Sequence, residues 1–267
     1  MLGAITDDPT PILGDTRTCS KLTAEPGDDD LRSAGLALVK SRSHWWASAT
    51  TSGANQTEGM SRMGLYARYV LPRLTDLTMS RKLLLPYRQR VVGGAAGRVL
   101  EIGIGSGLNL PLYGDAVEEV IGVDISPELL AMAERATQRR RLRVQLLEGS
   151  AEHLPSTIAD GSIDTMVVTW ALCSIPDAAA ALVEAHRVLR PNGSLRFVEH
   201  GRSPDTSVAW WQDRLTPLWR RCSGGCHLNR KTDDLLRSAG FTLTHLTTGY
   251  APGPRPMAFM YEGQAQP

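Results

Sequence analysis

A short apolar run that leads directly into three closely spaced glycines most restricts the folds open to this chain. Residues 99–102 form the run, and Gly103, Gly105 and Gly107 follow it. Glycine reaches positive φ at little cost and has no Cβ, so the backbone here can turn sharply and approach a ligand closely. The pattern predicts a buried strand that enters a ligand-binding turn, as found at the carboxyl edge of open α/β sheets.

Strand and helix signals alternate along the rest of the chain. Further apolar runs predict strands at residues 120–123, 142–147, 163–169, 195–198, 241–246 and 257–261. Apolar residues at helical spacing predict helices at residues 126–136, 178–189 and 230–239. This alternation predicts an α/β fold with a Rossmann-like, doubly wound and mainly parallel sheet of seven strands.

The first part of the chain has a different composition. Residues 1–59 are rich in Asp, Gly, Thr and Ser, and only residues 36–39 and the pair Trp45-Trp46 supply apolar anchors. A segment that buries so little apolar surface cannot offset its ordering entropy, so we predict a largely disordered extension, with a small subdomain as the alternative. The main domain is then predicted at residues 60–267.

This domain begins with a segment, residues 65–90, in which apolar residues recur at helical intervals and many basic residues lie among them. A basic amphipathic helix can lie on a membrane surface, which would allow peripheral membrane contact. The commoner arrangement packs the apolar stripe on the domain and leaves the basic face in solvent, and this is the expectation.

The bulk composition excludes several classes of protein. The formal net charge is +1, so no overall field favours nucleic acid as a partner. No apolar run reaches the roughly 18–20 residues that span a bilayer, and the N-terminus lacks the basic-then-apolar order of a secretory signal. We therefore expect a cytoplasmic protein without a transmembrane segment.

The spacing of the four cysteines suggests no disulfide framework; they are Cys19, Cys173, Cys222 and Cys226. Cys222 and Cys226 resemble half of a zinc site, but only His227 lies close to them in the sequence. Structural zinc sites take four ligands in paired short spacings, so we expect no metal.

The glycine turn has features of a nucleoside site. Asp124 ends the second predicted strand, about twenty residues further on, where it can accept hydrogen bonds from ribose hydroxyls. The dinucleotide fingerprint needs glycine at its sixth position, where this turn has Leu108. Glu101 lies inside the first strand; it would repel a pyrophosphate but tolerate the cationic amine and sulfonium of S-adenosylmethionine. A nicotinamide-dependent oxidoreductase is therefore a weaker alternative, beside a non-catalytic nucleoside-binding module.

Several ordered motifs resemble the class I S-adenosylmethionine-dependent methyltransferases. They are residues 101–107, Asp124, residues 149–155, residues 160–164 and residues 187–193. The resemblance implies that S-adenosylmethionine is the cofactor. The residues it assigns to cofactor binding are Glu101, Gly103, Gly105, Gly107, Asn109, Asp124, Ile125, Ser150, Ala151, Glu152 and Thr169. Many family members have Asp where this chain has Ser150, so the adenine contact is left open among residues 150–152.

Three further segments resemble a subgroup, the mammalian thiol S-methyltransferases and their bacterial relatives. They are residues 108–113, the pair Glu199-His200 and the pair Gly225-Cys226. This resemblance implies that a small-molecule acceptor, an apolar alkyl or aryl thiol, receives the methyl group. A phospholipid amine or a quinone or phenol ring is the alternative acceptor.

The acceptor site is expected to follow the fourth and fifth strands. His200 is the candidate catalytic residue, either as a general base or as an orienting group. Leu172, Trp211 and Cys226 are candidates for the lining of the acceptor pocket. Trp211 belongs to an aromatic helical stretch that could form a lid over the acceptor or face the core.

Overall fold

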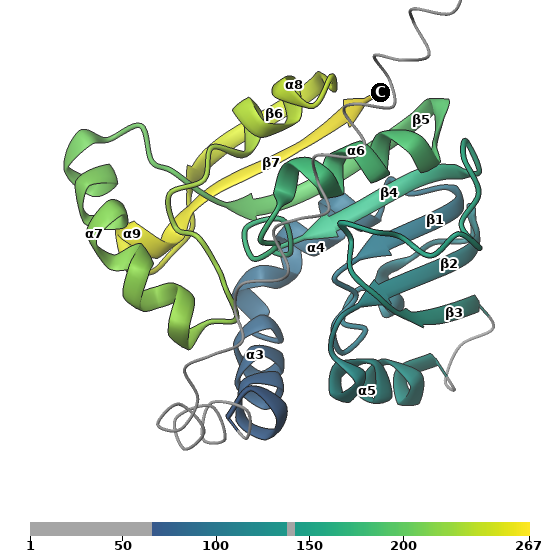
Figure 1. Ribbon diagram of the computed structural model, residues 1–267, viewed down its shortest axis with the longest axis horizontal. Coiled ribbons are helices and arrows are strands. Elements are labelled where there is room, and N and C mark those ends of the chain that lie inside the picture. The colour runs from purple at the N-terminus through teal and green to yellow at the C-terminus, as the bar shows by residue number, and fades with distance from the viewer. Residues whose placement is uncertain (1–65, 138–141) are drawn as a thin grey trace, which may run out of the picture. The chain divides into compact units, whose positions relative to one another are not determined.

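The computed structural model describes residues 66–137 and 142–267. The predicted extension at residues 1–59 lies outside them. Seven strands form one sheet: β1 Gly97–Ile102, β2 Val117–Asp124, β3 Arg143–Glu148, β4 Ile163–Thr169, β5 Leu189–His200, β6 Thr242–Tyr250 and β7 Phe259–Gln266. Their order is β3-β2-β1-β4-β5-β7-β6 (Figure 1).

The sheet is mainly parallel, and only β7 runs antiparallel to its two neighbours. The strand order reverses between β1 and β4, which leaves a crevice at the carboxyl ends of these strands. The predicted doubly wound α/β sheet is thus confirmed, and this reversal fixes where a ligand can bind.

The helical elements that the structure describes are η1 Tyr66–Val70, α3 Leu71–Met79, η2 Lys82–Leu84, α4 Leu85–Val92, η3 Leu110–Leu112, α5 Pro127–Thr137, α6 Ala178–Val188, α7 Thr206–Cys222, α8 Thr232–Ser238 and α9 Arg255–Ala258. Two of them begin at side-chain caps. Ser126 Oγ accepts from the Leu129 amide at 3.2 Å, and an Asp177 carboxylate oxygen accepts from the Ala180 amide at 3.0 Å. Such caps satisfy amides that have no partner within the helix.

Two hydrophobic clusters lie on the two faces of the sheet. One includes Leu100 and Phe197 and is covered by α6 and α8. The other includes Val99 and Val198 and packs against α4 and the inner side of α5. Side chains alternate between faces along each strand, so apolar residues at successive positions indicate a strand buried on both sides.

Two expectations need correction. The fifth strand was predicted at residues 195–198, but β5 spans residues 189–200, because residues 190–193 loop out of register with β4 and pairing continues on either side. The apolar stripe of the segment at residues 65–90 was expected to pack on the domain. In α3, however, Leu74 and Leu77 are exposed and only Pro72 is buried, because the helix turns Pro72, Thr75 and Met79 toward a cavity and not toward the domain core.

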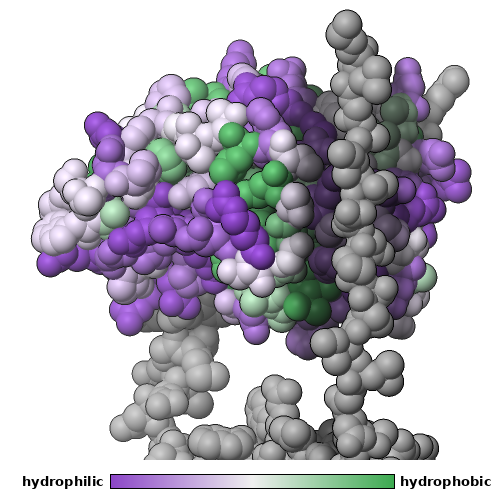
Figure 2. Space-filling view, turned by 90° about the horizontal axis from the view of Figure 1, so that it is seen from above, coloured by the Kyte–Doolittle hydropathy of each residue, from purple (hydrophilic) through white to green (hydrophobic). Residues whose placement is uncertain are grey.

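The face shown in Figure 2 is mostly hydrophilic, with a short band of apolar residues across it. Among residues 66–137 and 142–267, no helix combines the length and the apolar character needed to cross a bilayer.

Candidate active site

The glycines after β1 form a tight turn at the carboxyl edge of the sheet. Gly103, Gly105 and Gly107 have positive φ, at +68°, +58° and +80°. The Gly103 amide donates to the carbonyl oxygen of Val123 on β2 at 2.8 Å, and the Gly105 amide donates to Oδ2 of Asp124 at 2.9 Å. The turn is therefore fastened to the end of β2.

The three glycines have different surroundings. A Cβ added at Gly103 would lie 2.5 Å from the Cβ of Ala171, and one added at Gly107 would lie 2.8 Å from a methyl group of Leu110. At Gly105 the nearest described atom to such a Cβ is the Gly103 carbonyl oxygen, 3.9 Å away. Gly103 and Gly107 thus allow close packing, whereas Gly105 keeps space open.

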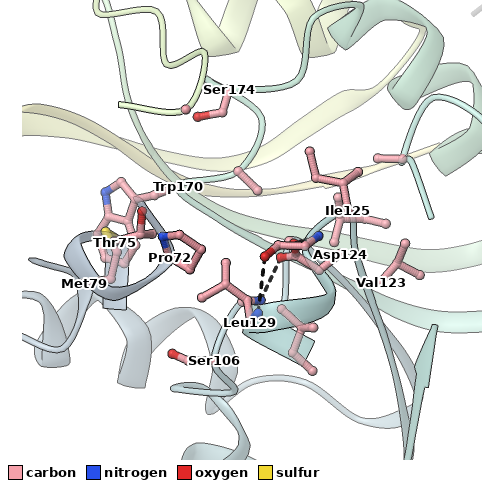
Figure 3. Close-up of a pocket in the computed structure, with 18 of the residues that line it drawn as sticks. Pro72, Thr75, Met79, Ser106, Val123, Asp124, Ile125, Leu129, Trp170 and Ser174 are labelled. Atoms are coloured by element: carbon pink, nitrogen blue, oxygen red, sulfur yellow. Dashed lines mark hydrogen bonds between the residues drawn. The ribbon is translucent and has the colours of Figure 1, made fainter. Parts of the chain in front are cut away.

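That open space belongs to a cavity of about 660 Å³. The glycine turn, the end of β2 and the start of α5 line one side of it, and α3 lines another. Figure 3 shows Pro72 and Met79 of α3 with Trp170 on the side opposite Asp124 and Ile125. The cavity therefore lies where the topology places the ligand crevice, between an acidic strand end and a more apolar wall.

A buried polar cluster lies beneath the turn. Asn109 donates to Oε1 of Glu101 at 2.8 Å, and the Tyr113 hydroxyl donates to Oε2 at 2.7 Å. Arg88 donates to the Asn109 carbonyl oxygen at 2.8 Å and to the Thr169 hydroxyl at 3.3 Å. All five side chains are buried, so the cluster holds a carboxyl group and a guanidinium out of solvent.

Burial is the main influence on the charges of this cluster. It raises the pKa of Glu101 to about 7, although the hydrogen bonds from Tyr113 and Asn109 and the charge of Arg88 oppose the shift. Burial also lowers the pKa of Arg88, against the attraction of Glu101. The Nε atom of Arg88 has no hydrogen-bond partner among the described residues. Arg88 also lines the cavity, so its guanidinium can attract an anionic group there.

Asp124 is held at the rim of the same cavity. Its Oδ1 accepts from the Ser126 amide at 2.9 Å, and its Oδ2 accepts the bond from Gly105. Burial raises the pKa of Asp124, while the bonds from the Ser126, Gly105 and Ile125 amides act against that rise. Each carboxylate oxygen has a second lone pair, so Asp124 can still accept hydrogen bonds from a ligand.

Comparisons with known proteins agree with this arrangement. Residues 100–197 match the family model described as a methyltransferase domain. The chain is 35% identical to human thiol S-methyltransferase TMT1B over 175 residues, which cover 64% of this chain and 71% of that protein. It is 31% identical to human thiol S-methyltransferase TMT1A, over 69% of this chain and 78% of that protein. The chain belongs to the class I S-adenosylmethionine-dependent methyltransferases.

A shorter match reaches a different kind of methyltransferase. The chain is 35% identical to the phosphatidylethanolamine N-methyltransferase of Cereibacter sphaeroides over 111 residues, which cover 41% of this chain and 53% of that protein. In fold it resembles the 1,6-didemethyltoxoflavin-N1-methyltransferase of Burkholderia thailandensis, with a TM-score of 0.56, 17% identity and coverage of 80% and 91% of the two chains. The membership of the methyltransferase family sets aside the oxidoreductase and the non-catalytic module.

The structure of this methyltransferase separates the predicted cofactor residues into two groups. Those that line the cavity are Gly103, Gly105, Asp124, Ile125, Ser150, Ala151, Glu152 and Thr169. Those that lie behind its wall are Glu101, Gly107 and Asn109. The second group supports the turn and sets its charge, and its members reach a ligand only through their neighbours.

The segment at residues 150–152 forms the part of the cavity that the family resemblance assigns to adenine. The Ser150 hydroxyl lies 3.1 Å from Oε2 of Glu152 and accepts from the Glu152 amide at 3.2 Å. Oε1 of Glu152 accepts from the Asp177 amide at 2.6 Å. Ser150 and Glu152 are thus bonded to each other, and Glu152 is also bonded to the Asp177 amide, so the adenine contact stays open among residues 150–152.

The predicted acceptor residues lie outside the cavity wall. Leu172 and Cys226 are buried, and Nε2 of His200 lies 2.7 Å from Sγ of Cys226. Trp211 is 52% exposed on α7, whose buried side is formed instead by Val208, Ala209, Gln212 and Thr216. None of the four predicted residues is among those that line this cavity, so their contacts with an acceptor stay predictions.

Sequence reasoning missed two contributors to the site. Arg88 was recorded only as one of many basic residues, because nothing local shows that it turns inward beneath the glycine turn. The wall formed by α3 was also missed, although its helical spacing was recognised. Its Asp76 accepts a hydrogen bond of 2.5 Å from the Ser106 hydroxyl on the turn, a contact across thirty residues that no pattern predicts.

The pKa of Glu101 predicts how cofactor binding depends on pH. The cationic amine and sulfonium of S-adenosylmethionine favour the ionised carboxylate, so binding below pH 7 must expel its proton. We expect the affinity to rise with pH by up to about tenfold per unit below this pKa, and to level off above it. Calorimetric titration between pH 5.5 and 8, in buffers with different ionisation enthalpies, measures both the affinity and the proton release.

The matched control is Glu101→Gln, which keeps the shape of the side chain and has no proton to lose. Its affinity should not vary with pH over this range. A pH-independent affinity in the unmodified protein, without proton release, would show that Glu101 is ionised before the ligand binds.

Proposed function

We propose that this methyltransferase transfers a methyl group from S-adenosylmethionine to a small apolar thiol. The observation that carries the acceptor class is the similarity to two thiol S-methyltransferases, which extends over 71% and 78% of their lengths. The cofactor assignment rests in addition on the chemistry of the cavity.

The residues present fit S-adenosylmethionine. The unpartnered Nε of Arg88 suits the carboxylate of its methionine part, and Glu101 supplies negative charge near the amine and sulfonium. Asp124 suits the ribose hydroxyls, and the missing Cβ at Gly105 leaves room for the ligand against the backbone. A zwitterionic nucleoside therefore finds complementary groups at each end.

When bound, S-adenosylmethionine supplies an electrophilic methyl group on a sulfonium centre. The reaction is an in-line displacement, so the protein's task is to align the acceptor and exclude water. The thiol of cysteine has a pKa of about 8.5, and an acceptor of similar acidity ionises partly near neutral pH. The proposal therefore needs no strong general base.

The acceptor is placed on the side of the cavity opposite Asp124 (Figure 3). Pro72 and Met79 of α3 and the ring of Trp170 line this side. Such a wall suits the carbon skeleton of an apolar thiol. His200 faces Cys226 and not this space, so the proposal does not use it as a base; contacts of Leu172, Trp211 and Cys226 with the acceptor stay predictions.

An acceptor panel tests the proposal. The full chain is incubated with S-adenosylmethionine and either an alkyl thiol, an aryl thiol, a phenol, a quinol or vesicles that contain phosphatidylethanolamine. We expect S-adenosylhomocysteine and an S-methylated product only with the thiols, at a rate that rises with pH toward the thiol's own pKa. A reaction without acceptor gives the background.

Methylation of phosphatidylethanolamine or of a ring, without thiol turnover, would replace the thiol by the alternative acceptor and leave the methyltransferase assignment intact. No binding of S-adenosylmethionine at all would contradict the cofactor assignment itself.

Two expectations accompany the proposal. We infer that the methyltransferase domain comprises residues 60–267, since the described elements begin at Tyr66 and run to Gln266. We also infer that the enzyme works in the cytoplasm, because the spacing of its four cysteines suggests no disulfide framework.

A further inference from the structure

Three loops next to the cavity bring two cysteines and a histidine together. Cys173 follows β4, His200 ends β5, and Cys226 lies between α7 and α8. One sulfur or ring nitrogen atom from each residue lies within 4.8 Å of the others. Cys173 and Cys226 are 4% and 6% exposed, and His200 is partly buried. The three donor atoms thus converge inside the protein.

The imidazole of His200 is oriented toward the sulfurs. Its Nε2 lies 2.7 Å from Sγ of Cys226, and its Nδ1 has no hydrogen-bond partner among the described residues. The ring is therefore positioned by the two sulfur atoms and by packing. A disulfide between Cys173 and Cys226 would leave this histidine without a role, whereas a metal ion would use all three donors.

The donor set indicates which ion fits. Zinc is bound in proteins by cysteine sulfur and histidine nitrogen, and a site with three protein ligands keeps a fourth position for water or another small ligand. Thiolates select soft and borderline cations over Mg²⁺ and Ca²⁺. Within the described residues, no carboxylate and no further cysteine or histidine belongs to this group, so the set is two sulfurs and one nitrogen.

The main chain around Cys173 is fixed by hydrogen bonds. Oε1 of Glu199 accepts from the amides of Ala171 and Leu172, and Oε2 accepts from the amide of Cys173 at 3.1 Å. The His227 amide donates to the Cys173 carbonyl oxygen at 2.9 Å. Bonds that orient the residues carrying metal ligands preserve the geometry of a site when it is empty.

We propose that Cys173, His200 and Cys226 bind one zinc ion. Binding releases the protons of both thiols to solvent, and the two thiolates balance the charge of the cation. The ion joins the loop that contains Ser174 to the loop that contains Gly224, and both of these residues line the cavity. His200 thereby has a metal-binding role in place of the base predicted from the sequence, and the proposal holds for any methyl acceptor.

The test measures metal directly. Full-length protein without a histidine tag is purified under reducing conditions, and its zinc content is measured by plasma mass spectrometry. Protein freed of metal is then titrated with Co²⁺. We expect about one equivalent of zinc per chain, and a cobalt spectrum with a thiolate charge-transfer band and the visible bands of a tetrahedral site.

Cysteine variants provide the matched comparison. Cys173→Ser and Cys226→Ser should each weaken metal affinity by more than about 100-fold. Cys222→Ser changes an exposed cysteine four positions before Cys226 and should bind as the unmodified protein does. Thermal melts of each variant identify any loss that results from unfolding.

The outcomes separate the alternatives. Absence of both zinc and the cobalt thiolate band from folded, reduced protein would overturn the proposal. Metal binding by the Cys173→Ser and Cys226→Ser variants as tight as that of the unmodified protein would also overturn it. A disulfide-linked Cys173–Cys226 peptide from protein purified without reductant, with no metal taken up after reduction, would replace the metal site by a redox pair.

Discussion

Replacement of Gly105 by alanine should weaken cofactor binding by about 100-fold, or about 2.7 kcal/mol. The new methyl group enters open cavity space beside the Asp124 carboxylate, where a ligand must approach the backbone. The substitution also places a side chain at φ +58°, which costs about 1–2 kcal/mol of stability. Calorimetric titration with S-adenosylhomocysteine measures the first effect, and urea unfolding measures the second.

Gly161→Ala is the matched control. Gly161 has a φ of +55°, no described atom lies within 4 Å of an added Cβ, and the residue is not part of the cavity wall. The Gly161→Ala variant should lose as much free energy of unfolding as Gly105→Ala and keep full cofactor affinity. Equal affinities for the two variants would mean that the cavity at Gly105 is not the cofactor site.

Glu199→Ala should be the most destabilising single substitution among the polar residues of the site. Glu199 is fully buried, and its carboxylate accepts from three consecutive amides, at residues 171, 172 and 173. Alanine leaves these donors buried without a partner, so we expect a loss of about 3–5 kcal/mol in the free energy of unfolding. Urea denaturation monitored by circular dichroism provides the value.

Glu262→Ala is the control for loss of a carboxylate from the neighbouring strand. Glu262 is 15% exposed and pairs with Arg90, which is 53% exposed. Removal of this partly solvated carboxylate should cost about 1–2 kcal/mol, less than is expected for Glu199→Ala. If Glu199→Ala were no more destabilising than Glu262→Ala, the loop after β4 would have to be held by its other contacts.

The sequence pair Glu199-His200 suggested an acceptor site, and the structure shows that Glu199 also supports the neighbouring loop. Glu199 fixes the loop that carries Ala171, and Ala171 packs against Gly103 of the turn. The residue thus stabilises the cofactor side of the cavity through the main chain. A motif shared with a family identifies residues that matter, but it does not say whether they contact a ligand.

The sequence by itself determined the fold and the centre of the site. Apolar runs and helical spacings report local conformation. They predicted the first four strands to within three residues, whereas β5, β6 and β7 each extend four to six residues beyond the predicted run. Glycine spacing and an acid at the end of the second strand predicted that Gly105 and Asp124 meet at one edge, because parallel strands bring their carboxyl ends together. These features can be read from the sequence because each depends on residues that lie close together in the chain.

The tertiary structure alone decided which residues from distant segments meet. Arg88 reaches Asn109 and Thr169 across 21 and 81 positions, and His200 meets Cys226 across 26. It also decided that Trp211 faces outward, since spacing along a helix defines a stripe but not which side of the helix packs on the domain. The physical reason is that the burial of a side chain depends on how all the helices pack on the sheet. No periodic pattern in the sequence reports that packing.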